Sequence, residues 1–161
     1  MALLGSDNSQ FFGFEADFVD SLRCIPMAVR FRLDVTGVKM KLNEWSKLDK
    51  ARRVDLAQTP CATEVEIRLY REEISLLVEK TSGSPPSMLA ELPVPVWESP
   101  DEVPVQVINQ ARDLDLEVPL QAWACLSTLQ RFALIKLSRS GHENRNFLPA
   151  MFEFGLAPKP D

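Results

Sequence analysis

The most apolar stretch of the chain, Pro119–Ser138, carries hydrophobic side chains at positions all around a helix. Such a helix belongs at the centre of a soluble domain, because none of its faces favours water. Helix start and stop signals predict further helices along the chain. They run over Met27–Thr36 with Gly37 as its stop, from Glu44 to about Gln58 with Asn43 as cap, from Pro60 to about Thr81 with a stop near Gly83, and from Pro104 to Asp113. Phe147–Phe154 is either a last short helix or an apolar clip. With few strand signals, the pattern predicts an all-α fold: an irregular bundle of five to six helices around residues 119–138.

The helix predicted from Pro60 to Thr81 has two apolar stripes. The wide stripe consists of Ile67, Tyr70, Ile74, Leu77 and Val78. The narrow stripe lies almost opposite and consists of Val65, Leu69 and Leu76. A helix with two such faces is either sandwiched between layers or offers its second stripe to another protein. We expect packing within the domain.

Residues 84–104 contain six of the twelve prolines, which predicts an extended arm. The part Leu92–Trp97 is too apolar for a free linker, so we expect a strap laid over the core, with docking to a partner as the alternative. A chain of 161 residues suggests one domain. We assign that helical domain to residues 11–156, between a flexible N-terminal tail (1–10) and a C-terminal tail (157–161).

Composition and charge narrow the class of protein. The chain is 45% hydrophobic and 25% charged, as in ordinary globular proteins. It has no basic leader and no run of roughly 18 apolar residues, so we expect a cytoplasmic protein without membrane contact.

The net charge of −5 is unevenly distributed along the chain: residues 23–53 hold nine basic and three acidic residues (+6), and residues 91–117 hold seven acidic and one basic (−6). This polarity can orient a charged protein partner or belong to two solvated faces, and it suits nucleic acid poorly.

The three cysteines, Cys24, Cys61 and Cys125, are odd in number and far apart. They form no CxxC pair, so neither a disulfide framework nor a zinc or iron–sulfur site is expected. With one histidine in the chain, we predict no metal site and no cofactor. The thiols are expected to pack as small apolar groups, with Cys125 inert inside the central helix.

The polar segment from Arg139 to Phe147 contains the only histidine and follows the most apolar helix. We predict that it contacts a partner, together with part of the basic region. The candidate residues are Arg139, His142, Glu143, Asn144, Arg145, Asn146, Arg23, Arg52 and Arg53. Pinning of helix ends is the alternative for the segment. Arg52 falls on an apolar helix face and needs either a partner or a carboxylate, for which Asp49 and Asp55 are the local candidates.

Catalysis is the competing interpretation. An imidazole beside a carboxylate can act as a general acid or base, and a pocket formed by Arg23, Cys24, His142 and Glu143 would suit a small enzyme or a metabolite-binding protein. However, neither a Gly-rich phosphate loop nor a GxSxG elbow is present. We therefore predict that the chain is not an enzyme.

Several strings resemble the nitrate reductase-associated protein family, over about Phe11 to Leu156. The longest are Ser21-Leu22-Arg23-Cys24-Ile25-Pro26-Met27, Phe12 to Val19, Arg131 to Leu137 and Gly141-His142-Glu143-Asn144, together with Trp45 and Pro60-Cys61-Ala62-Thr63. Ser140 stands where the family pattern has proline.

The resemblance implies a cyanobacterial-type accessory protein of the assimilatory, molybdenum-containing nitrate reductase. Such a protein would bind the catalytic chain and support its maturation, stability or activity, while the redox chemistry belongs to the partner. The family supplies no active-site residues, so the candidates above rest on polarity and position. A weaker alternative is an adaptor for an acidic electron donor such as ferredoxin, bound through the basic region.

Overall fold

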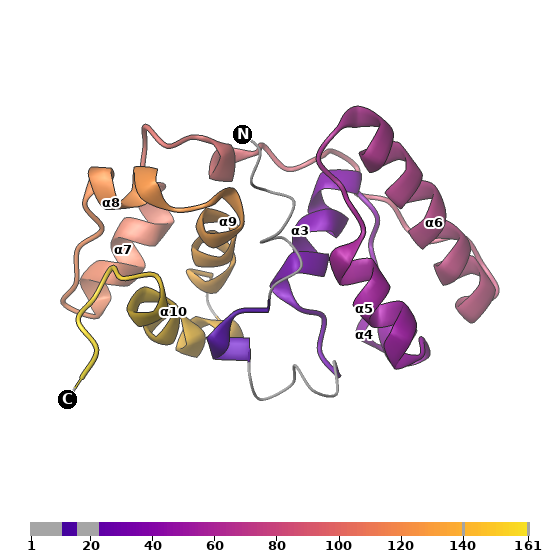
Figure 1. Ribbon diagram of the computed structural model, residues 1–161, viewed down its shortest axis with the longest axis horizontal. Coiled ribbons are helices and arrows are strands. Elements are labelled where there is room, and N and C mark those ends of the chain that lie inside the picture. The colour runs from indigo at the N-terminus through magenta and orange to yellow at the C-terminus, as the bar shows by residue number, and fades with distance from the viewer. Residues whose placement is uncertain (1–10, 16–22, 140, 161) are drawn as a thin grey trace. The chain divides into compact units, whose positions relative to one another are not determined.

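The computed structural model describes residues 11–15, 23–139 and 141–160 (Figure 1). Over these residues the regular elements are helices, which confirms the all-α class. Eight are α-helices, more than the five to six predicted. The elements are η1 (Gly13–Glu15), α3 (Met27–Thr36), α4 (Leu42–Ser46), α5 (Lys50–Gln58), α6 (Glu64–Ser82), η2 (Val96–Glu98), α7 (Val105–Asp113), α8 (Leu120–Cys125), α9 (Thr128–Leu137), η3 (His142–Asn146) and α10 (Phe147–Glu153).

The chain divides into two compact units, with the boundary between Val94 and Pro95. The assignment of residues 11–156 to one domain stays a prediction, and the predicted tail 1–10 lies outside the described residues. None of the described helices has both the length and the hydrophobicity needed to cross a membrane.

Helix α3 of the first unit has the predicted bounds. Pro26 precedes it, and Gly37 ends it in the left-handed conformation (φ 78°) with its N–H donating to Leu33 O. The buried carboxylate of Glu15 caps the other end, because its Oε1 accepts from the backbone N–H of Met27 at 2.7 Å. Backbone N–H groups at a helix start lack partners within the helix, so a carboxylate there is favourable.

The single helix predicted from Glu44 to Gln58 is wrong. The structure has two helices, α4 and α5, separated at residues 47–49. Asp49, not Asn43, is the effective cap: its Oδ1 accepts from the N–H of Arg52 at 2.8 Å. The apolar periodicity continues through the break, so it gave no sign of it.

Helix α6 begins at Glu64, four residues after the predicted start at Pro60, and ends at Gly83 as predicted. Thr63 and Glu66 form a capping box at its start. Its wide stripe packs into the core of the unit, with Tyr70, Ile74 and Val78 fully buried. The expectation that the narrow stripe is also packed within the domain is wrong, because its three residues are exposed: Val65 by 53%, Leu69 by 55% and Leu76 by 67%.

The proline-rich segment that follows α6 is extended as predicted, apart from the short turn η2. It lies antiparallel to the chain after α3: Lys39 N donates to Ser87 O at 2.9 Å, and Leu89 N donates to Gly37 O at 2.7 Å. Leu92 approaches Gly37 so closely that a Cβ at residue 37 would lie 2.8 Å from its Cδ2. This part of the segment is therefore held against the first unit.

In the second unit, α7 begins at Val105, one residue after the predicted start, and ends at Asp113 as predicted, while α10 begins at Phe147 as predicted and ends one residue before its predicted end. The continuous helix predicted over residues 119–138 is wrong, because the chain leaves helical conformation at Leu126 and Ser127. Ser127 caps α9 in a capping box with Gln130. All-round burial is found for α9, where Leu129 and Arg131 to Leu137 are all buried. Helix α8 is more exposed, as Leu120 (50%) shows.

Candidate functional site

The polar segment after α9 forms the 3-10 turn η3, which leads directly into α10. Asn144 holds this turn in place. Its Oδ1 accepts from Nε2 of Gln110 on α7 at 3.0 Å, and its Nδ2 donates to the backbone oxygen of Arg139 at 3.1 Å. Its side chain therefore ties η3 to α7 and to the end of α9, which is the pinning role considered as an alternative for this segment.

Arg139 and Arg145 are the exposed cations of the segment, and Asn146 is half-buried. Both arginines can reach a partner without prior rearrangement of the turn. The side chains of His142 and Glu143 lie outside what the structure describes, as does Ser140. Partner contact through His142 and Glu143 thus stays a prediction.

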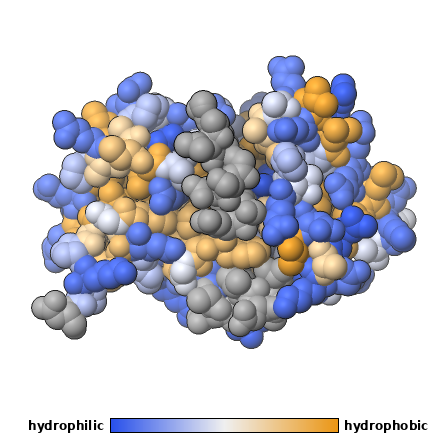
Figure 2. Space-filling model, in the orientation of Figure 1, coloured by the Kyte–Doolittle hydropathy of each residue, from blue (hydrophilic) through white to orange (hydrophobic). Residues whose placement is uncertain are grey.

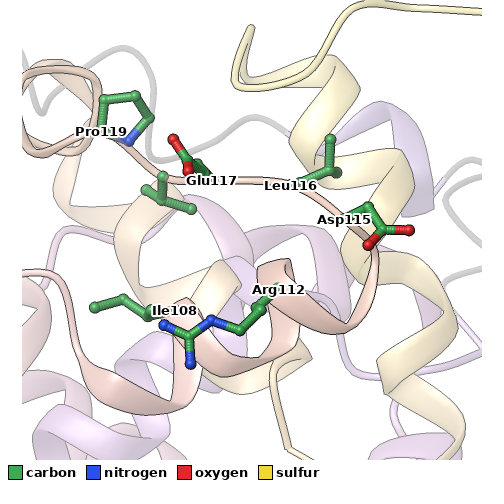
Figure 3. Close-up of a pocket in the computed structure, with 7 residues that line it drawn as sticks. Ile108, Arg112, Asp115, Leu116, Glu117 and Pro119 are labelled. Atoms are coloured by element: carbon green, nitrogen blue, oxygen red, sulfur yellow. The ribbon is translucent and has the colours of Figure 1, made fainter.

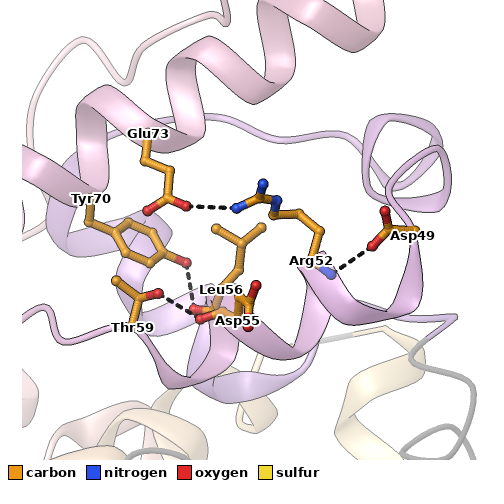
Figure 4. Close-up of polar contacts among 7 residues, drawn as sticks. All are labelled: Asp49, Arg52, Asp55, Leu56, Thr59, Tyr70 and Glu73. Carbon is orange, nitrogen blue, oxygen red and sulfur yellow. Dashed lines mark hydrogen bonds and ion pairs between the residues drawn. The ribbon is translucent and has the colours of Figure 1, made fainter.

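Arg52 in the basic region pairs with neither of the predicted local carboxylates. Its Nη1 lies 3.3 Å from Oε1 of Glu73 on α6 (Figure 4). Asp49 accepts from the backbone of Arg52 instead, and the backbone oxygen of Asp55 accepts from Oγ1 of Thr59 at 2.7 Å. The ion pair is exposed, with 45% and 36% of the two side chains accessible, so it contributes at most about 1 kcal/mol.

Arg53 has a different role, because it binds the backbone of the break between α4 and α5. Its Nε donates to Leu48 O and its Nη2 donates to Ser46 O, both at 2.9 Å. The guanidinium carbon also lies 6.0 Å from the centre of the Trp45 ring, a distance at which a cation–π attraction operates. Arg53 therefore stabilises the fold, whereas Arg23 is exposed.

Two buried arginines were not singled out as candidates from the sequence, Arg32 (2% exposed) and Arg131 (6% exposed). Arg32 donates to Thr59 O and to Ala28 O, each at 2.8 Å. Arg131 donates from Nε to Trp97 O at 2.6 Å and from Nη1 to Leu126 O at 2.7 Å. Burial lowers the pKa of both guanidinium groups. Because their donors bind backbone carbonyls, these residues position loops and are not available to a ligand.

The second unit carries an open pocket of about 510 Å³ beside the C-terminal half of α7 (Figure 3). Its lining combines apolar and charged side chains: Ile108, Arg112, Asp115, Leu116, Glu117, Val118 and Pro119. The loop follows a Schellman turn, in which Leu116 N donates to Ala111 O and Asp115 N donates to Arg112 O. Asp115 adopts the left-handed conformation (φ 57°) that this turn requires.

This pocket is not the one predicted from the sequence. Arg23 and Cys24 belong to the first unit and are not among the described residues that line the pocket beside α7, while His142 and Glu143 belong to the second unit and their side chains lie outside what the structure describes. The predicted pocket formed by these four residues stays a prediction.

The three thiols differ in their surroundings. Cys61 is buried, and burial raises its pKa to about 11. Cys24 and Cys125 are exposed, so the expectation that the thiols pack as small apolar groups is wrong for both, and Cys125 is not enclosed within a central helix. It sits at the last position of α8, where the helix predicted to continue is interrupted. Among the described residues, no three His, Cys, Asp or Glu side chains come together as metal ligands would.

Comparison with known proteins identifies the family. The sequence model of the conserved nitrate reductase-associated proteins matches residues 11–154. This match includes both units, the turn η3 and the basic region. No curated protein and no solved structure gives a significant match. Because the family match covers most of the 161 residues, the chain belongs to the family of conserved nitrate reductase-associated proteins.

Proposed function

We propose that this protein binds the catalytic chain of the assimilatory, molybdenum-containing nitrate reductase and supports its maturation, stability or activity. The observation that carries the proposal is the family match over residues 11–154, since the family is named for association with nitrate reductase. In this proposal the chain does not reduce nitrate. It acts in the cytoplasm by contacting the enzyme that does.

In the second unit, we propose that the contact residues are the exposed arginines of the polar segment Arg139–Asn146, which contains η3 and is called the η3 segment below. Arg139 and Arg145 are both exposed, and Asn144 fixes the turn between them. A turn held at α7 and α9 presents its cations with little conformational freedom left to lose, which favours binding. His142, Glu143 and Asn146 complete this segment in the proposal, and Asn144 acts by positioning it.

In the first unit, Arg23 is the cation that we propose for contact. Arg52 can contribute only by exchanging Glu73 for a carboxylate of the partner, because its guanidinium already forms that ion pair. Arg53 keeps its two backbone acceptors in either state. The role of the basic region is thus narrower than its formal charge suggests.

Retention of reductase by the tagged full-length protein tests the proposal. Wild-type protein is expected to retain the reductase at low and moderate salt. The double variant Arg139→Ala/Arg145→Ala should retain at least fivefold less, with unchanged helical circular dichroism. The matched control Arg112→Ala/Lys159→Ala removes the same charge from other exposed positions of the second unit and should retain as much as wild type.

Two results would count against the proposal. If folded wild-type protein retains no folded reductase at either salt concentration, the proposed function is wrong. If wild type retains reductase and both double variants lose it equally, binding depends on net charge and the η3 segment is not the contact. His142→Ala, measured beside them, tests whether the only histidine contributes.

A further inference from the structure

The outward face of α6 carries a row of apolar and acidic side chains that the proposed function does not use. Positions 65, 69, 72, 76 and 79 are spaced by four, three, four and three residues, the spacing of a coiled-coil seam. They are Val65, Leu69, Glu72, Leu76 and Glu79, and all five are exposed. We call this row the α6 seam.

The α6 seam lies opposite the side of the helix that anchors it to the first unit. Tyr70, Ile74 and Val78 are fully buried, and the hydroxyl of Tyr70 donates to Leu56 O at 2.9 Å. The capping box at Thr63 and the left-handed Gly83 fix the two ends of α6. The seam is therefore displayed by a 19-residue helix that needs no further ordering to bind. Figure 2 shows orange side chains among blue ones at the end of the view where α6 lies in Figure 1.

The charges on the α6 seam indicate what covers it. Glu72 and Glu79 alternate with the leucines, and no lysine or arginine occupies a seam position. A helix packed along this row would bring both carboxylates partly out of water, which is costly unless a cation meets them. A partner that carries lysine or arginine at the positions that face Glu72 and Glu79 therefore fits this row better than one that does not.

The seam positions of a second copy do not meet that requirement, because the exposed cations Arg68 and Lys80 flank the seam and do not lie in it. In a parallel pairing, Glu72 and Glu79 would each face the same residue of the copy. In an antiparallel pairing centred on Glu72, the two Glu72 carboxylates would meet. If the second helix is shifted along the first so that Val65 faces Leu76, Glu72 would face Leu69. Like charges in contact, or a carboxylate against leucine, disfavour each arrangement.

We infer that the α6 seam is a docking surface for a basic amphipathic helix of another protein, in which apolar residues at intervals of three and four alternate with lysine or arginine. This surface goes beyond the proposed function: it uses none of the residues proposed there for contact with the reductase, and it does not require the reductase to be the partner. Recognition of this kind lays one helix on another, with leucines as anchors and charge pairs as the source of specificity.

Two synthetic peptides provide the test. Each is about three heptads long and has leucine at alternate seam positions; the remaining seam positions are lysine in one peptide and glutamate in the other. Fluorescence anisotropy measures their binding to the full chain. The lysine peptide is expected to bind at least tenfold more tightly than the glutamate peptide, and Glu72→Lys/Glu79→Lys should reverse this preference.

Apolar variants distinguish docking from simple charge attraction. Leu69→Ser/Leu76→Ser keeps the charge of the chain and should weaken binding of the lysine peptide at least tenfold. The control Val105→Ser/Leu120→Ser removes apolar side chains that are 68% and 50% exposed elsewhere and should leave binding unchanged. Circular dichroism verifies that each variant is folded.

Several results would overturn the inference: no binding of the lysine peptide, equal binding of the two peptides, or equal losses in both serine double variants. Sedimentation showing a wild-type dimer that Leu69→Ser/Leu76→Ser dissociates would assign the seam to a second copy instead. Because these measurements use no reductase, a failure of the reductase-retention experiment leaves them intact, and the reverse also holds.

Discussion

Replacement of Arg131 by lysine tests how the second unit is held together. Arg131 is 6% exposed, and its donors bind two backbone oxygens that belong to different segments: Trp97 O, at 2.6 Å, and Leu126 O, at 2.7 Å. The first belongs to η2, and the second lies in the break between α8 and α9. The guanidinium therefore links three parts of the unit. Lysine keeps the charge and most of the length but has no donor at the position of Nε.

In Arg131→Lys the ammonium can reach only one of these two oxygens, so the other is left buried without a donor. An unpaired buried carbonyl costs about 1–3 kcal/mol, and we expect the free energy of unfolding to fall by about 2 kcal/mol. Urea denaturation followed by circular dichroism measures this change. The control Arg139→Lys alters an exposed arginine and should change stability by less than about 0.5 kcal/mol. Equal stability of Arg131→Lys and wild type would refute the account of Arg131 as a link between segments.

Three further predictions concern the first unit and the thiols. Gly37→Ala should lower the free energy of unfolding by about 1–2 kcal/mol, because φ is 78° and a side chain there is strained. The control Gly83→Ala has the same backbone strain, but no atom lies within 4 Å of its new Cβ. A larger loss at residue 37 than at residue 83 therefore measures the contact with Leu92, and Leu92→Ala should remove the difference. In a thiol-reagent assay near pH 8, Cys24 and Cys125 should react quickly and Cys61 only on unfolding, since burial raises the pKa of Cys61 to about 11; three fast thiols would contradict this. Hydrogen bonds from the backbone N–H groups of Thr63 and Ala62 lower the pKa of Glu66 from 4.5, so its charge stabilises the protein above pH 4.5 and this contribution is lost as pH falls through the lowered pKa. The urea midpoints of wild type and Glu66→Gln should therefore differ most near neutral pH and converge in acid. A difference that does not change with pH would refute the assignment.

The sequence predicted helices well where their ends carry local signals. Pro26 and Gly37 bound α3, Pro104 precedes α7, and Gly83 ends α6. A proline or glycine at such a position acts through its own backbone, so its effect can be read without knowledge of the fold. The same local logic gave the extended course of the proline-rich segment.

Two predicted helices are broken in the structure, and the breaks share a stabilising contact that periodicity cannot show. At each break, an arginine of the following helix binds the carbonyl five residues before it: Arg53 binds Leu48 O, and Arg131 binds Leu126 O. These bonds replace the helical ones that the break loses. A signal was nevertheless present at the second break, because Ser127 and Gln130 have the spacing of a capping box.

The candidate site could be predicted only partly from the sequence, because the composition does not show which acceptors the guanidinium group of an arginine binds in the fold. The balance of +6 over residues 23–53 counts Arg32, Arg52 and Arg53 as available cations. Arg32 is buried against backbone oxygens, Arg52 pairs with Glu73, and Arg53 binds the α4–α5 break.

The exposed cations that remain in this region are Arg23 and four lysines, Lys39, Lys41, Lys47 and Lys50. A lysine ammonium is strongly hydrated and carries none of the fork geometry that makes arginine selective for carboxylates. Attraction through these residues is thus long-ranged and weakened by salt, and gives little specificity. An acidic electron donor such as ferredoxin, the weaker alternative, would have to be held mainly by such contacts. The turn around Asn144 offers two arginines on a fixed backbone instead, which is why we place specific recognition of the reductase there.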